Sequence, residues 1–206
     1  MPALLQAARL WGAANAGLLW VGRWLAVGCL GLMVAIILVQ VVARYVLNNA
    51  LPWPDEAARF FMLWMTGLMA PTALRRGGFV AIDMLVLMLP RVVASVLMLG
   101  LLAVSGMVLL VAAQLGWAEV TGFGGSFKSA SLMTFFTIDF ADGVPFVRVD
   151  WGWQPMPRSH MMASLMVGVW LMLTVTGELM LRQIITMMGH GDALPDIPEN
   201  ATVGAE

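Results

Sequence analysis

Two long runs of uncharged, apolar residues constrain the fold of this chain more than any other feature of its sequence. Trp24 to Ala43 is a run of 20 residues without a formal charge, and Val92 to Ala113 is a run of 22. About 20 apolar residues in a helix cross the roughly 30 Å hydrocarbon core of a bilayer. Since 61% of the residues are hydrophobic, only 11% are charged and the mean hydropathy is +0.87, an ordinary soluble domain is excluded. The chain is therefore predicted to be an integral membrane protein.

Two weaker apolar runs complete the predicted fold. Ala57 to Leu74 is interrupted only by Arg59, and Met161 to Gly177 is uncharged and continues to Glu178. We expect an all-α membrane protein with four transmembrane helices in a single domain, 1–189, followed by a disordered cytoplasmic tail, 190–206. The four spans are predicted at about 24–46, 55–75, 92–115 and 160–183.

The segments outside the spans are predicted from their length and pattern. Residues 2–23 mix apolar and polar side chains, which favours an N-terminal interfacial helix. Phe79 to Leu89 is too short to cross and contains one charge, Asp83, so a short interfacial helix is expected between spans two and three. In the loop 118–159, apolar and polar residues alternate on both sides of Asp142-Gly143. This alternation predicts a β-hairpin, with an irregular loop as the alternative.

Charges in the short connections set the predicted orientation. Arg75, Arg76 and Arg91 form a tight basic group between spans two and three. The loop 118–159 is long, so its charges count for little under the positive-inside rule. Both termini are therefore expected on the cytoplasmic side, with the loop 118–159 on the opposite side.

The sequence offers no constellation of residues for catalysis. The one cysteine, Cys29, excludes an internal disulfide and a cysteine metal cluster, and His160 and His190 cannot pair across a bilayer to bind haem. No HExxH, GxSxG or P-loop pattern occurs, and a net charge of −1 gives no basic surface for nucleic acid. Glu178 lies four residues before Arg182, which favours an ion pair over the alternative of a proton-binding site. We expect no enzymatic activity, metal or cofactor in this chain.

The second predicted span has the pattern of a docking helix. Glu56 and Arg59 share a face that continues at helical spacing to the small residues Gly67 and Ala70. Small residues let another membrane helix approach closely. Because burying unpaired charges in a membrane is expensive, Arg44 is expected to join Glu56 and Arg59 in one network.

The stretch from Leu51 to Pro90 resembles a known family, the small membrane subunit, DctQ type, of tripartite ATP-independent periplasmic (TRAP) transporters. In that family an arginine and an aromatic residue close span one, and a tryptophan precedes an acidic helix start. A second tryptophan and a hydrophobic-Asp segment ending in Leu-Pro follow. The matching residues are Arg44-Tyr45, Trp53, Pro54, Asp55, Glu56, Trp64, Ala70, Leu74-Arg75, Ile82-Asp83 and Leu89-Pro90. The chain lacks the glycine that the family often has near Met69 and the histidine near Phe79, so any role of that imidazole does not carry over.

The resemblance implies a non-catalytic subunit of the bacterial inner membrane. It would form a stable heterodimer with the large multi-span transport subunit and transiently help dock a substrate-loaded periplasmic binding protein. Sodium and an organic acid, such as a C4-dicarboxylate, would bind the large subunit. The subunit-interface candidates are Arg44, Trp53, Asp55, Glu56, Arg59, Trp64, Gly67, Ala70, Arg75 and Asp83.

Two other functions stay open at the level of sequence. An independent four-helix, proton-coupled exporter would need a carboxylate embedded in the membrane, and would transport without a partner. A membrane anchor subunit of an oxidoreductase would carry haem or quinone.

Overall fold

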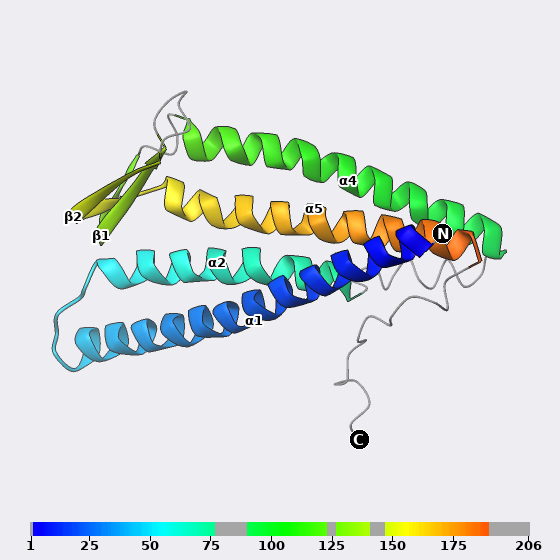
Figure 1. Ribbon diagram of the computed structural model, residues 1–206. Coiled ribbons are helices and arrows are strands. Elements are labelled where there is room, and N and C mark those ends of the chain that lie inside the picture. Colours follow the sequence, from blue (N-terminus) through cyan, green and yellow to red (C-terminus); the bar gives the residue numbers. More distant parts are fainter. Residues whose placement is uncertain (1, 77–89, 123–126, 141–146, 190–206) are drawn as a thin grey trace, which may run out of the picture. The chain divides into compact units, whose positions relative to one another are not determined.

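A computed structural model describes residues 2–76, 90–122, 127–140 and 147–189. Within these ranges the chain forms long helices and one pair of strands (Figure 1). In chain order the elements are α1 (Pro2–Tyr45), α2 (Trp53–Arg75), α4 (Arg91–Thr121), β1 (Lys128–Phe140), β2 (Val147–Pro157) and α5 (Ser159–Met187). The predicted interfacial helix with Asp83, the turn at Asp142-Gly143 and the tail 190–206 lie outside the described residues.

Three of the described helices are long and apolar enough to cross a membrane. They are Leu4–Tyr45 in α1, Val93–Thr121 in α4 and Ser159–Met187 in α5. α2 is not among them, although its 23 residues give it a length of about 35 Å. Its acidic first turn and Pro71 make it less apolar than the other three. The fourth crossing therefore stays a prediction.

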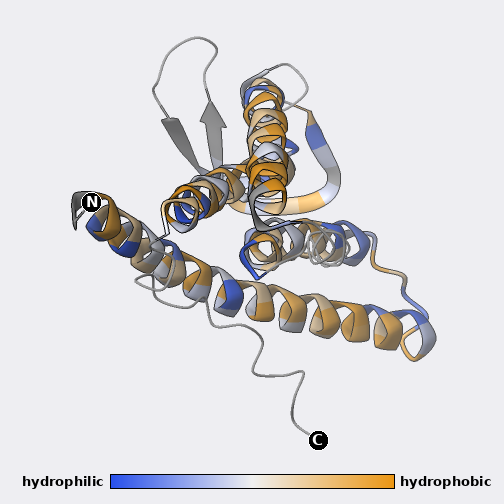
Figure 2. Ribbon diagram, turned by 90° about the vertical axis from the view of Figure 1, so that its right-hand side faces the viewer, coloured by the Kyte–Doolittle hydropathy of each residue, from blue (hydrophilic) through white to orange (hydrophobic). Residues whose placement is uncertain are grey.

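Apolar residues surround α1 and α4 on nearly all sides (Figure 2). Large side chains on these helices, such as Trp24, Val104 and Val108, are 61%, 63% and 62% exposed. A helix that is apolar all round belongs in a membrane or in the core of a large protein. The exposed faces of α1 and α4 are therefore surfaces for lipid or for a partner helix.

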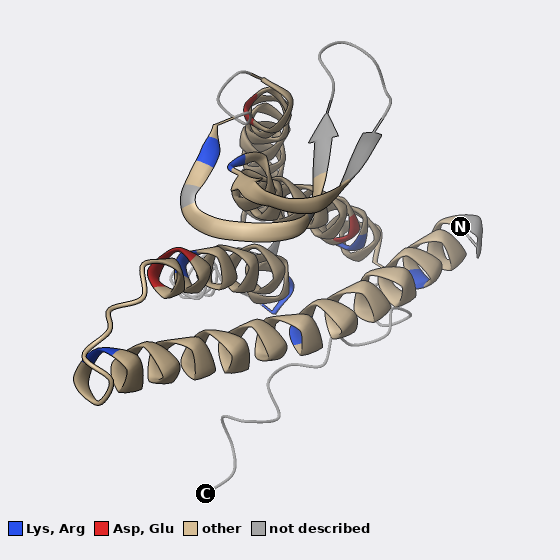
Figure 3. Ribbon diagram, turned by 90° about the vertical axis from the view of Figure 1, so that its left-hand side faces the viewer, with Lys and Arg blue, Asp and Glu red and all other residues tan. Residues whose placement is uncertain are grey.

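α1 is one unbroken helix of 44 residues. The predicted interfacial helix 2–23 and the first span are continuous in it, so the boundary predicted near Trp24 is not a break in the helix. After Pro2 this segment contains no proline, and Figure 3 shows its charged residues as isolated bands on an otherwise uncharged helix. At about 66 Å, the helix is roughly twice as long as one crossing of the hydrocarbon core requires.

The chain divides into two compact units, and each unit takes part of every helix. Unit 1 consists of Met1–Val21, Ala70–Val111 and Trp170–Glu206, and unit 2 consists of Gly22–Met69 and Ala112–Val169. In unit 1, Leu19 of α1, Leu74 of α2 and Val175 of α5 form a buried apolar core.

In unit 2, α2 and α5 touch through glycines. A Cβ atom placed on Gly67 would lie 2.4 Å from the carbonyl oxygen of Ser164, and one on Gly168 would lie 2.7 Å from the carbonyl oxygen of Gly67. A side chain at either position would collide with the backbone of the other helix. Small residues thus set how closely these two helices pack.

Two antiparallel strands, β1 and β2, form the only sheet among the described residues. Ile138 pairs with Val149 and Phe140 with Val147. The strands contain the segment whose alternation is described above, and they extend it to Lys128 and Pro157. An irregularity in the register lies between Thr134 and Phe136. Opposite it is Gly152, whose φ of 146° is a conformation that favours glycine.

Candidate functional site

The carboxylate of Glu178 in α5 is fully buried and accepts hydrogen bonds from side chains of three helices in unit 1. Its side chain is 0% exposed. Arg75, the last residue of α2, donates from Nε to one carboxylate oxygen at 3.1 Å and from Nη2 to the other at 2.8 Å. Arg182 donates from Nε at 3.0 Å, and the amide of Asn15 in α1 donates at 2.8 Å. These four residues, here called the Glu178 cluster, join α1, α2 and α5.

The absence of a side chain at Gly12 of α1 leaves room for the Glu178 cluster. Nη2 of Arg75 donates a further hydrogen bond to the carbonyl oxygen of Gly12 at 2.8 Å. A Cβ atom on Gly12 would lie 2.9 Å from Oε1 of Glu178 and 3.0 Å from Nη2 of Arg182. Forked arginine–carboxylate pairs are among the strongest hydrogen bonds in proteins. With four donated bonds on one carboxylate, the cluster is suited to holding helices together.

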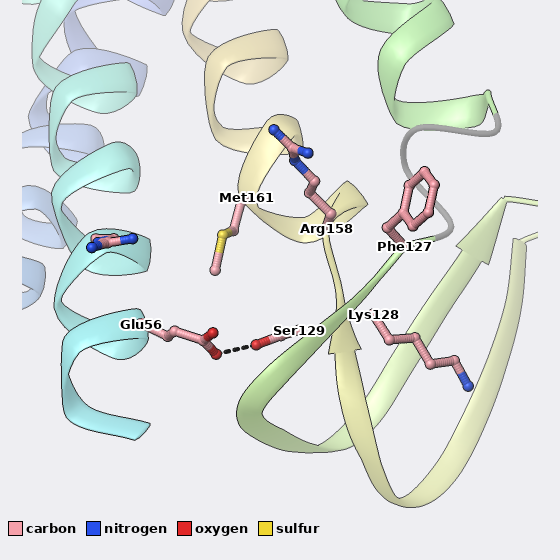
Figure 4. A pocket seen from close by; sticks show the side chains of 7 residues that line it. Glu56, Phe127, Lys128, Ser129, Arg158 and Met161 are labelled. Carbon is pink, nitrogen blue, oxygen red and sulfur yellow. Dashed lines mark hydrogen bonds between the residues drawn. The ribbon is translucent and has the colours of Figure 1, made fainter. Parts of the chain in front are cut away.

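A second carboxylate, that of Glu56 in the first turn of α2, holds the strand β1 in unit 2. Its Oε2 accepts a hydrogen bond from the hydroxyl of Ser129 (Figure 4). The same oxygen accepts bonds from the backbone amides of Ser131 at 3.2 Å and Leu132 at 3.0 Å. The hydroxyl of Ser131 donates to the carbonyl oxygen of Pro52 at 3.2 Å. These contacts, here called the Glu56 clamp, attach the start of β1 to the start of α2.

A cleft of about 440 Å³ lies beside the Glu56 clamp. Its walls come from α2 and from the residues at and just before the starts of β1 and α5: Glu56, Arg59, Phe127, Lys128, Ser129, Arg158 and Met161. In Figure 4, Met161 points toward α2, whereas Lys128 extends away from Glu56. Three basic side chains and one acidic side chain give the lining a positive formal charge, which suits an anionic group.

The predicted network of Arg44, Glu56 and Arg59 is not formed among the described residues of this chain. Both ion pairs found among the described residues belong to the Glu178 cluster. Glu56 binds β1 instead, and the guanidinium of Arg44 lies 5.9 Å from the centre of the Tyr45 ring. Arg44 and Arg59 are both exposed, so neither needs a buried counter-charge.

The other candidate residues are distributed over both units. Asp55 accepts a hydrogen bond at 3.0 Å from the side-chain amide of Gln40, which links α2 to α1. The surface of Gly67, predicted to receive a partner helix, is occupied by α5 of the same chain. Trp53 is exposed and Ala70 is half-buried. Nε1 of Trp64 is buried without a hydrogen-bond partner in the described structure. The role of these residues at a subunit interface stays a prediction.

Sequence reasoning found one of the three partners of Glu178 and missed the other two. Arg182 follows from the local i, i+4 spacing. The predicted topology contained a signal for Arg75, because spans two and four would run in the same direction and end on the same side of the membrane. Asn15 was a further signal, since a polar side chain in an apolar helix needs a partner. No pattern in the sequence identifies Ser129 and Ser131 as partners of Glu56.

Within the parts of the chain that the structure describes, no three His, Cys, Asp or Glu side chains are grouped so as to hold a metal ion. Whether the whole chain works without a cofactor stays a prediction.

Comparison with protein-family models matches residues 33–186 to the family described as tripartite ATP-independent periplasmic transporters, DctQ component. No curated protein matches the chain. The matched range covers about three quarters of the chain, ends in the last turn of α5, and contains every residue of the Glu56 clamp. It also contains the Glu178 cluster except for Asn15.

Proposed function

The chain belongs to the DctQ family, the small membrane component of TRAP transporters, and from this we propose that it is a scaffold for the large transport subunit. It binds that subunit in the bacterial inner membrane, with both of its own termini in the cytoplasm and four crossings of the bilayer. It also helps a substrate-loaded periplasmic binding protein to dock. Sodium and the transported organic acid bind the large subunit.

An open glycine surface on α1 carries the proposal. No described atom lies within 4 Å of a Cβ atom placed on Gly28 or on Gly31. Ala26, on the opposite side of the helix, is buried at 2% exposure, so the glycine surface faces away from the rest of unit 2. Glycines on an apolar face let a second helix approach its backbone closely. This surface supports the docking of a partner helix better than Gly67, where α5 is already packed.

The state of Glu178 favours a scaffold over a proton-coupled exporter. A transport carboxylate has to release its partners in order to bind and lose a proton. Glu178 instead accepts four hydrogen bonds, three of them from arginines. Membership in a transporter family likewise favours a transport subunit over the anchor of an oxidoreductase.

The test is co-purification with the large subunit in mild detergent after Gly28→Leu and after Gly31→Leu. Either leucine fills the open surface without touching a charge, so we expect several-fold less large subunit to be recovered. Gly100→Leu on α4 is the matched control, because no described atom lies within 4 Å of a Cβ atom at that position either. Membrane insertion of each variant is checked separately.

Normal recovery from both α1 variants would remove the assignment of this surface to the large subunit.

A separate measurement tests the proposed scaffold function. The purified chain alone, reconstituted in vesicles, should take up no organic acid along a sodium gradient. Uptake by this chain alone would overturn the proposed function.

A further inference from the structure

Three aromatic side chains form an exposed cluster on the strands of unit 2. The ring of Phe135 packs edge-on against Trp151 and Trp153, with centroid distances of 6.2 Å and 5.9 Å. The three residues are 53%, 73% and 74% exposed. Contiguous apolar patches of this kind are uncommon on surfaces that face water only. We therefore expect these three side chains to contact something other than water.

The base of the strand pair is fixed at the level where two helices begin. The Glu56 clamp ties Ser129 and Leu132 to the first turn of α2. At the other strand, the backbone amide of Arg158 donates to the carbonyl oxygen of Phe127 at 2.8 Å. Arg158 is the one residue between the end of β2 and the start of α5. Because α5 is long and apolar enough to cross a membrane from Ser159 onward, this level is expected to lie near an edge of the hydrocarbon core.

The aromatic cluster cannot lie far from that edge. Phe135 is three residues beyond Leu132, which gives at most about 10 Å of extended strand. The headgroup layer on each side of a bilayer is roughly 5–8 Å thick. Phe135 is thus held within reach of the headgroups, and its ring contacts bring Trp151 and Trp153 to the same place.

We propose that Phe135, Trp151 and Trp153 insert into the headgroup layer of the bilayer, so that the strand pair anchors this end of unit 2 to the membrane surface. Indole suits that layer, because its apolar ring is buried among lipid while its N–H group still meets water. A lipid surface is favoured over a protein partner because the strands continue within a few residues into α4 and α5, whose exposed faces are themselves apolar. This inference does not depend on the proposed function of the chain.

The experiment places a nitroxide spin label at position 153 through Trp153→Cys, in a Cys29→Ala background. The full chain is reconstituted in phosphatidylcholine vesicles, and collisions with oxygen and with a water-soluble nickel complex are measured. We expect position 153 to collide more with oxygen and several-fold less with nickel than the matched position 154, labelled through Gln154→Cys. Gln154 is the neighbouring residue on β2, and its side chain is expected to point to the other face of the strand.

Equal nickel accessibility at 153 and 154 would place the cluster in water and overturn the proposal. Shielding of position 153 from both reagents would mean that protein covers it, which overturns the proposal equally. A measurement without a label guards against disturbance by the nitroxide. Lipids brominated near the headgroup should quench the wild-type fluorescence more than that of Trp151→Phe/Trp153→Phe, and equal quenching would contradict insertion.

Discussion

At Glu178, desolvation and pairing act against each other. An ionised carboxylate without access to water loses its hydration, and only partners with good geometry compensate for that loss. Arg75 supplies a fork of two bonds, Arg182 supplies one from the next turn of the same helix, and Asn15 supplies a neutral fourth. Loss of the carboxylate should therefore lower the stability of the cluster more than loss of any one of its donor side chains.

Glu178→Ala should destabilise the protein by about 3–5 kcal/mol, because the largely buried side chains of Arg75 and Arg182 would lose their counter-charge. Unfolding in mixed micelles, followed by tryptophan fluorescence, measures the change. Glu119→Ala is the control, since Glu119 is an exposed carboxylate on α4 and its loss should change stability by less than about 0.5 kcal/mol. Equal unfolding midpoints for the two variants would contradict the role given to Glu178.

Gly67→Ala should destabilise the protein by about 1–3 kcal/mol, because its new methyl group would meet the carbonyl oxygen of Ser164 at 2.4 Å and force α2 away from α5. The same unfolding measurement tests this prediction. Gly28→Ala is the matched control, since its Cβ would meet no described atom within 4 Å. Equal unfolding midpoints for the two variants would mean that the packing of α2 against α5 does not depend on the glycine contact.

At the scale of elements, long-range polar contacts decide where each helix and strand is held. α2 is tied at its start to β1 through Glu56, and at its end to α1 and α5 through Arg75. Asp55 and Glu56 are neighbours in sequence, yet one binds Gln40 of α1 and the other binds β1. The acidic start of α2 thus connects it to two different elements.

Glu56→Ala should loosen the start of β1, because the amide of Ser131 would lose its acceptor. The amide of Leu132 would keep only the hydroxyl oxygen of Ser129, at 3.2 Å. We expect faster hydrogen exchange at these two amides, measured by mass spectrometry in detergent. Asp55→Ala removes the adjacent carboxylate and should leave exchange at Ser131 and Leu132 unchanged. Slow exchange in Glu56→Ala would show that β1 is held by other contacts.

At the scale of the whole molecule, the number of crossings depends on α2. Its length of about 35 Å allows it to cross, but its composition is less apolar than that of α1, α4 and α5. If α2 crosses, its two ends lie on opposite sides of the membrane and the chain has four spans.

Asn49→Cys and Arg76→Cys, each in a Cys29→Ala background, test this directly. Asn49 should react with a membrane-impermeant maleimide added to spheroplasts, and Arg76 should react only after lysis. The expectation follows from the predicted cytoplasmic position of both termini. Labelling of both cysteines from the same side would leave three crossings and rule out the predicted topology.

The sequence alone determined the membrane character and the local contacts. Long uncharged runs such as Trp24 to Ala43 favour helices, because a bilayer offers no water to satisfy backbone groups. The order of residues from Arg44 to Pro90 was enough to indicate the DctQ family, which the match over residues 33–186 confirms. The pair of Glu178 with Arg182 was predictable because residues four apart meet on one helix face.

Only the tertiary structure decided which distant groups meet. Arg75 and Glu178 are 103 residues apart, and Glu56 and Ser129 are 73 apart, so no helical or strand period relates them. The same holds for Gly67 and Gly28, two glycines on apolar helices. Gly67 packs against α5, whereas no described atom lies near Gly28, because packing direction is set by the neighbouring helices and not by the residue itself.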